Sequence, residues 1–187
     1  MNIIVVARFK EDTSWMLQLP PGWQHDVVQK DRDIPNIGRE PLSFIWNILK
    51  NYHTIQDDDL YCFVQGWPFD HCPDLIEQLY TLTGKHLSSE FKYAALGAHW
   101  HNTDGQGRPA HGGLPVAHYY EEWFGKPFPA TGVEFVAGGQ YLVSGGGVKA
   151  RNKDFYQMLY DDILADPDRV PWVLERLWSE VFSGEVH

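Results

Sequence analysis

Two short apolar runs, separated by one amphipathic segment, limit most strongly what this chain can fold into. Residues 3–7 and 60–64 are apolar throughout and rich in β-branched and aromatic side chains, which is typical of strands buried on both faces. Residues 42–49 carry apolar side chains at the spacing of a helix with one buried face. This order predicts one α/β domain over residues 1–187, with three layers and a mostly parallel central sheet.

Weaker patterns predict the remaining elements. The segment 97–131 is rich in Gly, Pro and His without a clear period, so we expect long loops there. Asn152 can cap a helix through its side chain, and Pro171 is acceptable in a first helical turn. The patterns also predict a short helix at 15–19, a strand at 25–29, a helix at about 73–82, strands within 133–144 and two closing helices.

Composition excludes several classes of protein. No apolar run approaches the roughly 20 residues that span a bilayer, and the N-terminal residues lack the basic segment of a secretory signal. Cys62 and Cys72 are too few for a disulfide framework, so we expect reduced thiols and a cytoplasmic protein. A formal net charge of -10 disfavours a nucleic-acid partner.

Charged residues cluster where the first apolar strand ends. Arg8 and Glu11 lie between that strand and the next predicted helix, so Arg8 and free helix N–H groups could bind a phosphate there. The alternative is a solvated loop in which Asp12 caps the helix.

A second polar cluster precedes the helix of residues 42–49. Gly38 permits a positive φ and Asn36 can brace a turn. Arg39 suits a bidentate grip on an oxyanion, and Glu40 could accept a hydrogen bond from a sugar hydroxyl. The alternative is an Arg39–Glu40 pair that only stabilises the turn.

The second apolar strand also runs into polar residues. Gln65 and Gly66 follow it directly, and Trp67 offers a flat face on which a sugar ring could stack, although Trp is more often a core residue. Asp70 and His71 are candidate ligands for a divalent cation, but adjacent residues rarely bind one metal together.

Two further motifs admit several interpretations. His99 and His101 share one face of a strand and could bind a metal together with Asp70, or could be hydrogen-bonded surface histidines. The glycine-rich segment 138–147, which includes Gln140, lacks the spacing of a dinucleotide-binding motif and the Lys-Ser/Thr of a P-loop.

These segments together resemble a family of short proteins described only as a domain of unknown function. The resemblance extends over nearly the whole chain and is carried by residues 5–15, 35–40, 63–68, 139–144 and 175–182. More distantly, an apolar strand followed by Asn-x-Gly-Arg-acid and a strand ending at a polar site is similar to GT-A glycosyltransferases of the rhamnan-synthesis type.

The glycosyltransferase resemblance implies a nucleotide-diphospho-sugar transferase-like fold, a nucleotide-sugar donor and a glycan acceptor. It places Arg8, Glu11, Asn36, Arg39 and Glu40 at the donor, and Gln140 and Arg151 on the acceptor side. Arg8 and Arg39 would stabilise charge on the leaving diphosphate. Glu11 or Asp70 would act as the base on an acceptor hydroxyl.

One departure from the GT-A pattern concerns the metal. These enzymes usually place Asp-x-Asp after the strand that here ends at Val64, where it holds Mn²⁺ or Mg²⁺ on the diphosphate; this chain has Gln65 and Gly66 instead. The expected function is therefore sugar transfer. The alternatives are a carbohydrate- or nucleotide-binding module without catalysis, favoured by Trp67 and Trp100, and a His/Asp metal-dependent hydrolase.

Overall fold

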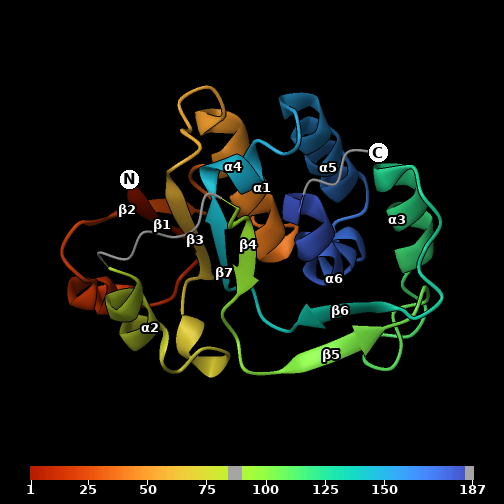
Figure 1. The fold of residues 1–187 in the computed structure, drawn as a ribbon, viewed down its shortest axis with the longest axis horizontal. Helices are drawn as coiled ribbons and strands as arrows, with labels where there is room; N and C mark the ends of the chain where they lie inside the picture. The colour runs from red at the N-terminus through yellow and green to blue at the C-terminus, as the bar shows by residue number, and fades with distance from the viewer. Residues whose placement is uncertain (84–89, 184–187) are drawn as a thin grey trace.

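A central five-stranded sheet organises the chain in the computed structural model, which describes residues 1–83 and 90–183 (Figure 1). The strand order is β2-β1-β3-β7-β4. The strands are β1 (Asn2–Arg8), β2 (Trp23–Gln29), β3 (Leu60–Gln65), β4 (Tyr93–Ala95) and β7 (Tyr141–Ser144). β1 pairs in parallel with β2 and β3, whereas β7 runs antiparallel to both β3 and β4.

The sheet is therefore mixed, where the sequence predicted a mostly parallel one. An apolar pattern marks a buried strand but not its direction, so the reversal of β7 was not predictable from it. Residues 133–144 form two strands, because Gly138, with φ +97°, interrupts them between β6 (Val133–Val136) and β7. β6 pairs antiparallel with β5 (Trp100–Thr103) in a separate two-stranded sheet.

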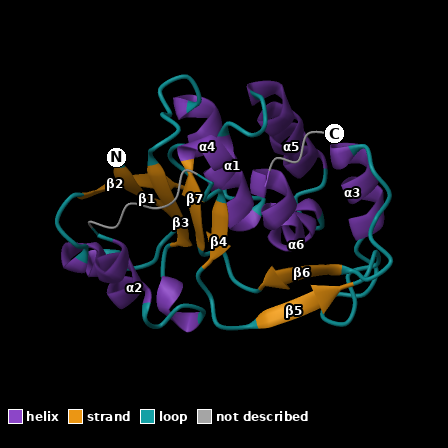
Figure 2. Ribbon diagram, viewed as in Figure 1, coloured by secondary structure: helices purple, strands orange, loops and turns teal. Residues whose placement is uncertain are grey.

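Helices cover both faces of the central sheet and give the expected three layers (Figure 2). On one face lie α1 (Arg39–Asn51), α5 (Lys153–Ala165) and α6 (Val170–Ser183), and on the other lie the 3₁₀ helix η1 (Ser14–Gln18) and α2 (Leu75–Leu82). The remaining helices are η2 (Pro68–Asp70), α3 (Val116–Phe124) and α4 (Gly145–Val148).

Alternation along β1 explains the two cores. Val5 belongs to the core beneath α1, α5 and α6, whereas Ile4 and Val6 belong to the core beneath η1 and α2. All three side chains are fully buried. Because successive side chains of a strand point to opposite faces, an uninterrupted apolar run supplies both cores at once.

The segment 97–131 is only partly loop, contrary to the sequence expectation. It contains β5 and α3, and α3 buries Val116, Tyr120 and Trp123 along one side. The four aromatic side chains that follow His118 in α3 obscured the helical period. Gly125, with φ +65°, ends the helix as a left-handed glycine commonly does.

Two helix termini follow the predicted chemistry. The Asn152 side chain accepts a hydrogen bond of 2.8 Å from the Phe155 N–H and begins α5, as expected, and Pro171 lies in the first turn of α6. No helix within residues 1–83 and 90–183 is long and apolar enough to cross a bilayer.

Buried phenol and thiol groups make the fold sensitive to alkaline pH. Burial raises the pKa of Tyr141 and Tyr156 well above 10.0, and burial together with Asp74 raises the pKa of Cys72 from 9.0 to about 12. These folded-state pKa values exceed those of the unfolded chain, so the stability they contribute is complete below about pH 9 and lost as pH rises. We predict that the free energy of unfolding in urea falls above pH 10, by roughly 1.4 kcal/mol per pH unit for each such group.

Tyr156→Phe tests this prediction, because the Tyr156 hydroxyl is buried and donates 2.8 Å to the Val148 carbonyl oxygen. The variant should lose the contribution of one group to the alkaline slope, whereas Tyr80→Phe, at a side chain 54% exposed, should keep the full slope. Equal slopes in wild type and Tyr156→Phe would contradict the assignment.

Candidate functional site

A polar cleft of about 240 Å³ opens at the edge of the sheet where β3 ends and β7 begins. Its lining comes from the start of α1, the end of β3, the turn before β7 and the first half of α6. We call this cavity the cleft. Its polar lining side chains are Arg39, Glu40, Gln65, His71, His101, His111, Glu175 and Arg176.

A left-handed turn positions the α1 side of the cleft. Gly38 has φ +65° and Arg39 has φ +48°, so two consecutive residues adopt a conformation that L side chains rarely take. The buried Lys30 ammonium, just past the end of β2, donates to the carbonyl oxygens of Ile37, at 3.1 Å, and of Arg39. These bonds hold the turn on either side of Gly38.

Lys30 is a buried cation behind the cleft. Burial lowers its pKa, the positive charge of Arg39 lowers it further, and the carboxylates of Glu40 and Glu11 oppose the shift. A lysine that satisfies two carbonyl oxygens in this position fixes backbone geometry, since its own side chain is not part of the cleft lining.

Arg39 keeps hydrogen-bonding capacity for a ligand. Its guanidinium lies 4.1 Å from the centre of the Trp172 ring, and its side chain is 50% exposed. Its Nε is 3.7 Å from Glu40 Oε2, longer than the roughly 2.7–2.9 Å of a strong charge-assisted hydrogen bond. The Arg39–Glu40 pair is therefore loose.

Arg176 places a second guanidinium in the wall of the cleft, with its side chain fully buried. It donates to the Trp172 carbonyl oxygen at 2.6 Å and to His111 Nδ1 at 2.9 Å. Its Nη1 is 3.5 Å from Glu175 Oε2, and its Nε has no hydrogen-bond partner in the described part of the chain. Burial lowers its pKa, and Glu175 opposes that shift.

The structure brings together four of the residues singled out in the sequence as the predicted site: Arg39, Glu40, Gln65 and His71 all line the cleft. Gly38 lies directly behind them and shapes the turn. The turn presents Arg39 and Glu40 at the cleft, and their role in binding a ligand stays a prediction.

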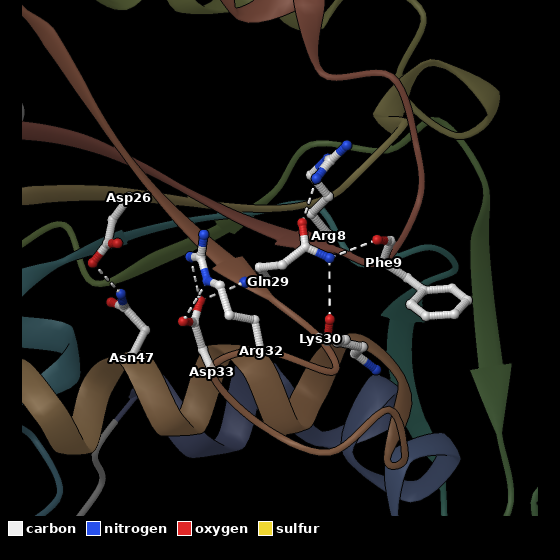
Figure 3. Close-up of polar contacts among 8 residues, drawn as sticks. All are labelled: Arg8, Phe9, Asp26, Gln29, Lys30, Arg32, Asp33 and Asn47. Carbon is white, nitrogen blue, oxygen red and sulfur yellow. Dashed lines mark hydrogen bonds and ion pairs between the residues drawn. The ribbon is translucent and has the colours of Figure 1, made fainter.

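Arg8 and Glu11 do not line the cleft, and their side chains bond instead at the ends of β1 and β2. Figure 3 shows the Arg8 guanidinium donating to Gln29 Oε1, while the Gln29 amide donates to the Phe9 carbonyl oxygen. Glu11 Oε2 accepts from the N–H groups of Phe9, at 2.7 Å, and Lys10, at 3.1 Å. These contacts join the ends of β1 and β2.

The remaining predicted residues lie outside the cleft lining. Gly66 packs so tightly that a Cβ there would lie 2.6 Å from Glu11 Oε2. Arg151 donates to the Glu180 carbonyl oxygen at 3.1 Å and stabilises helix packing. Gln140 is buried, and Asn36, Trp67 and Asp70 are exposed.

The predicted metal ligands do not form a complete cation site. His71 lines the cleft, but Asp70 does not. Across residues 1–83 and 90–183, no three His, Cys, Asp or Glu side chains are grouped so that they could hold a metal ion. We therefore derive no step of the chemistry through Mn²⁺ or Mg²⁺.

Sequence reasoning missed the α6 side of the cleft. The apolar pattern of α6 predicts a packing face made of residues 174, 177, 178 and 181. It gives no sign that Glu175 and Arg176, which lie between these positions, belong to a cleft. A charged pair beside an apolar stripe is a weak signal, because most such pairs are solvated. No sequence pattern predicts the role of Lys30, because its ammonium bonds to carbonyl oxygens seven and nine residues later in the chain.

The fold and the cavity define an α/β protein with a cleft at the carboxyl end of β3. The chain belongs to the family described as protein of unknown function (DUF3431), whose family model matches residues 3–187. This match confirms the resemblance to a family of unknown function. No curated protein and no solved structure matches the chain.

Substitution of Gly38 tests the turn that presents Arg39 and Glu40. A Cβ at Gly38 would lie 2.4 Å from Ile163 Cγ2, in addition to the strain of a positive φ. We predict that Gly38→Ala lowers the free energy of unfolding by about 2–4 kcal/mol, from combined strain and overpacking. Urea unfolding measures this loss.

Gly22→Ala is the matched control. Gly22 has φ +89°, but a Cβ there would meet nothing within 4 Å. It should lose only the conformational cost, about 1 kcal/mol. Equal losses in the two variants would show that Gly38 is not closely packed against α5.

Proposed function

We propose that this protein binds a nucleotide-sugar in the cleft and transfers the sugar to a hydroxyl acceptor. The observation that carries the proposal is one cleft, at the carboxyl edge of an α/β sheet, that holds guanidinium groups from α1 and α6 beside two carboxylates. The cleft also lies beside the carboxyl end of β3, and ligands of open α/β sheets bind outside the carboxyl ends of the strands.

The charges of the cleft suit a diphosphate on an otherwise acidic protein. The formal net charge of the chain is -10, yet the cleft pairs Arg39 and Arg176 with Glu40 and Glu175. Arg39 also stands at the first turn of α1, where unpaired N–H groups favour an anion. In this proposal Arg39 stabilises the charge that develops on the leaving diphosphate.

Glu175 is the carboxylate we assign as the base. Its Oε1 accepts 3.0 Å from the Gly138 N–H, which fixes the side chain, and its Oε2 faces Arg176. The acceptor oxygen forms a bond to the anomeric carbon as the bond from that carbon to the diphosphate oxygen breaks. The diphosphate leaves with the electron pair, and Glu175 takes the proton of the acceptor hydroxyl.

The size of the cleft limits how much of the ligand it encloses. Its 240 Å³ lies below the roughly 300–1,000 Å³ of pockets that enclose a drug-sized ligand. We therefore place the sugar and the diphosphate in the cleft. The nucleobase of the ligand would lie over the open surface near Arg8 and Gln65. A GT-A relationship remains part of the proposal.

Thermal unfolding tests ligand binding directly. We predict that one member of a panel (UDP-glucose, GDP-mannose, GDP-fucose and dTDP-rhamnose) stabilises the protein by about 2.7 kcal/mol at 100 times its Kd, which raises Tm by roughly 5–10 °C. Parallel samples with Mn²⁺ and with chelator measure metal dependence. A shift without turnover on any acceptor would favour the non-catalytic binding module, and no shift would contradict the proposal.

Arg39→Ala locates the diphosphate. Loss of a charged hydrogen bond should weaken nucleotide-sugar binding by about 1.5–3 kcal/mol in isothermal titration. Arg32→Ala, at an exposed arginine paired with Asp33, should bind as wild type does. Equal affinity in both variants would remove Arg39 from the ligand site.

Glu175→Gln separates catalysis from binding, because glutamine keeps the acceptor for the Gly138 N–H. We predict a turnover about 10²–10⁴-fold lower with little change in affinity, as for loss of a general base. Glu11→Gln, whose carboxylate bonds to backbone N–H groups, should lower stability rather than turnover. If Glu11→Gln alone abolishes turnover, the base is Glu11, one of the two carboxylates that the sequence left open for this role.

A further inference from the structure

A small chamber adjoins the floor of the cleft and contains polar groups that the mechanism above does not use. Its volume is about 20 Å³. It shares Glu40, Gly139 and Glu175 with the cleft, so the two cavities adjoin, and Tyr141 and Trp178 line it as well. We call this cavity the chamber.

Two buried donors at the chamber are unpaired. Tyr141 and Trp178 are each 1% exposed, and their rings lie 5.8 Å apart. The Tyr141 hydroxyl and the Trp178 indole N–H have no hydrogen-bond partner among the residues that the structure describes. Buried polar groups in folded proteins are normally paired with protein or ordered water, so these two donors call for an oxygen acceptor at the chamber.

The chamber has the size and chemistry to hold that oxygen. A cavity needs roughly 10–15 Å³ of free volume and two to four polar partners to hold a water molecule. The chamber offers 20 Å³, two donors and the carboxylates of Glu40 and Glu175 as acceptors. Burial, with Tyr93, Glu175 and Glu40 adding to it, raises the pKa of Tyr141, so this phenol stays a donor at neutral pH.

We infer that the chamber is a hydroxyl-recognition subsite, filled by one water molecule in the free protein and by one hydroxyl group of the sugar in the complex. The ligand half of this inference rests on the proposed function. The two donors would donate to the ligand oxygen, and the Glu40 carboxylate would accept the hydrogen bond that the ligand hydroxyl donates. A sugar that lacks this hydroxyl would leave the donors to water and gain no hydrogen bond from them, so the subsite selects among sugars.

The water half can be tested in the ligand-free protein. In ¹⁵N-labelled protein, the Trp178 indole N–H, identified by its loss in Trp178→Phe, should show a cross-peak to long-lived bound water. Tyr141→Phe should weaken that cross-peak, because the water loses one partner. Tyr93→Phe is the matched control, because Tyr93 stacks 5.8 Å from Tyr141 but does not line the chamber. A Trp178 indole without a water cross-peak in wild type overturns the inference.

The ligand half uses the nucleotide-sugar that stabilises the protein in the panel, together with its analogues that each lack one sugar hydroxyl. One analogue should bind wild type about three- to tenfold more weakly than the parent, the range for one neutral hydrogen bond. Tyr141→Phe should bind that analogue and the parent about equally, while Tyr93→Phe should discriminate as wild type does. Discrimination unchanged in Tyr141→Phe overturns the ligand half. If no nucleotide-sugar binds, the proposed function is contradicted. The water cross-peak then still tests whether the chamber holds a water molecule.

Discussion

The packing of α6 against the sheet determines both the main core and the wall of the cleft. Trp178 packs on Tyr141 of β7, and Leu174 is fully buried on the same side of the helix. Each such side chain contributes roughly 1.5–3 kcal/mol when it leaves water. Because a turn of helix takes 3.6 residues, burying this stripe fixes where Glu175 and Arg176 lie, at the edge where β3 ends and β7 begins. The cleft is therefore a consequence of core packing.

Arg176 shows what this arrangement costs. A buried guanidinium loses its hydration, and several kcal/mol of that loss must be offset by partners inside the protein. Trp172, His111 and Glu175 supply three contacts, and the Phe135 ring lies 4.8 Å from the guanidinium carbon. One nitrogen still lacks a partner within the described residues. A fully apolar side chain would satisfy this position more simply, so the incomplete pairing is consistent with a functional role.

The fold was predictable wherever one local pattern decides the outcome. The run at residues 3–7 predicts a strand buried on both faces because no polar side chain interrupts it, and Gly38 predicts a turn that presents Arg39 because only glycine takes a positive φ cheaply. Strand direction and the α6 half of the site were not predictable. They depend on long-range packing, which places Glu175 beside a helix start more than a hundred residues away. The position of Arg8 was not predictable for a related reason. Its guanidinium donates to Gln29 of the neighbouring strand and does not line the cleft.

The balance of charge in the cleft follows from where each charge is anchored. Glu40 and Glu175 face two guanidinium groups, Arg39 from α1 and Arg176 from α6. An aromatic ring and a histidine hold these two groups, while Lys30 behind the cleft bonds to backbone carbonyls. Under the proposed function, an anion that enters would meet Arg39, whose pairing with Glu40 is loose, and Arg176, which Trp172 and His111 already hold in place. Charges organised in advance stabilise a developing negative charge without reorganising during the reaction. On a chain of net charge -10, this local balance would favour the proposed anionic ligand at this edge of the sheet over the acidic remainder of the surface.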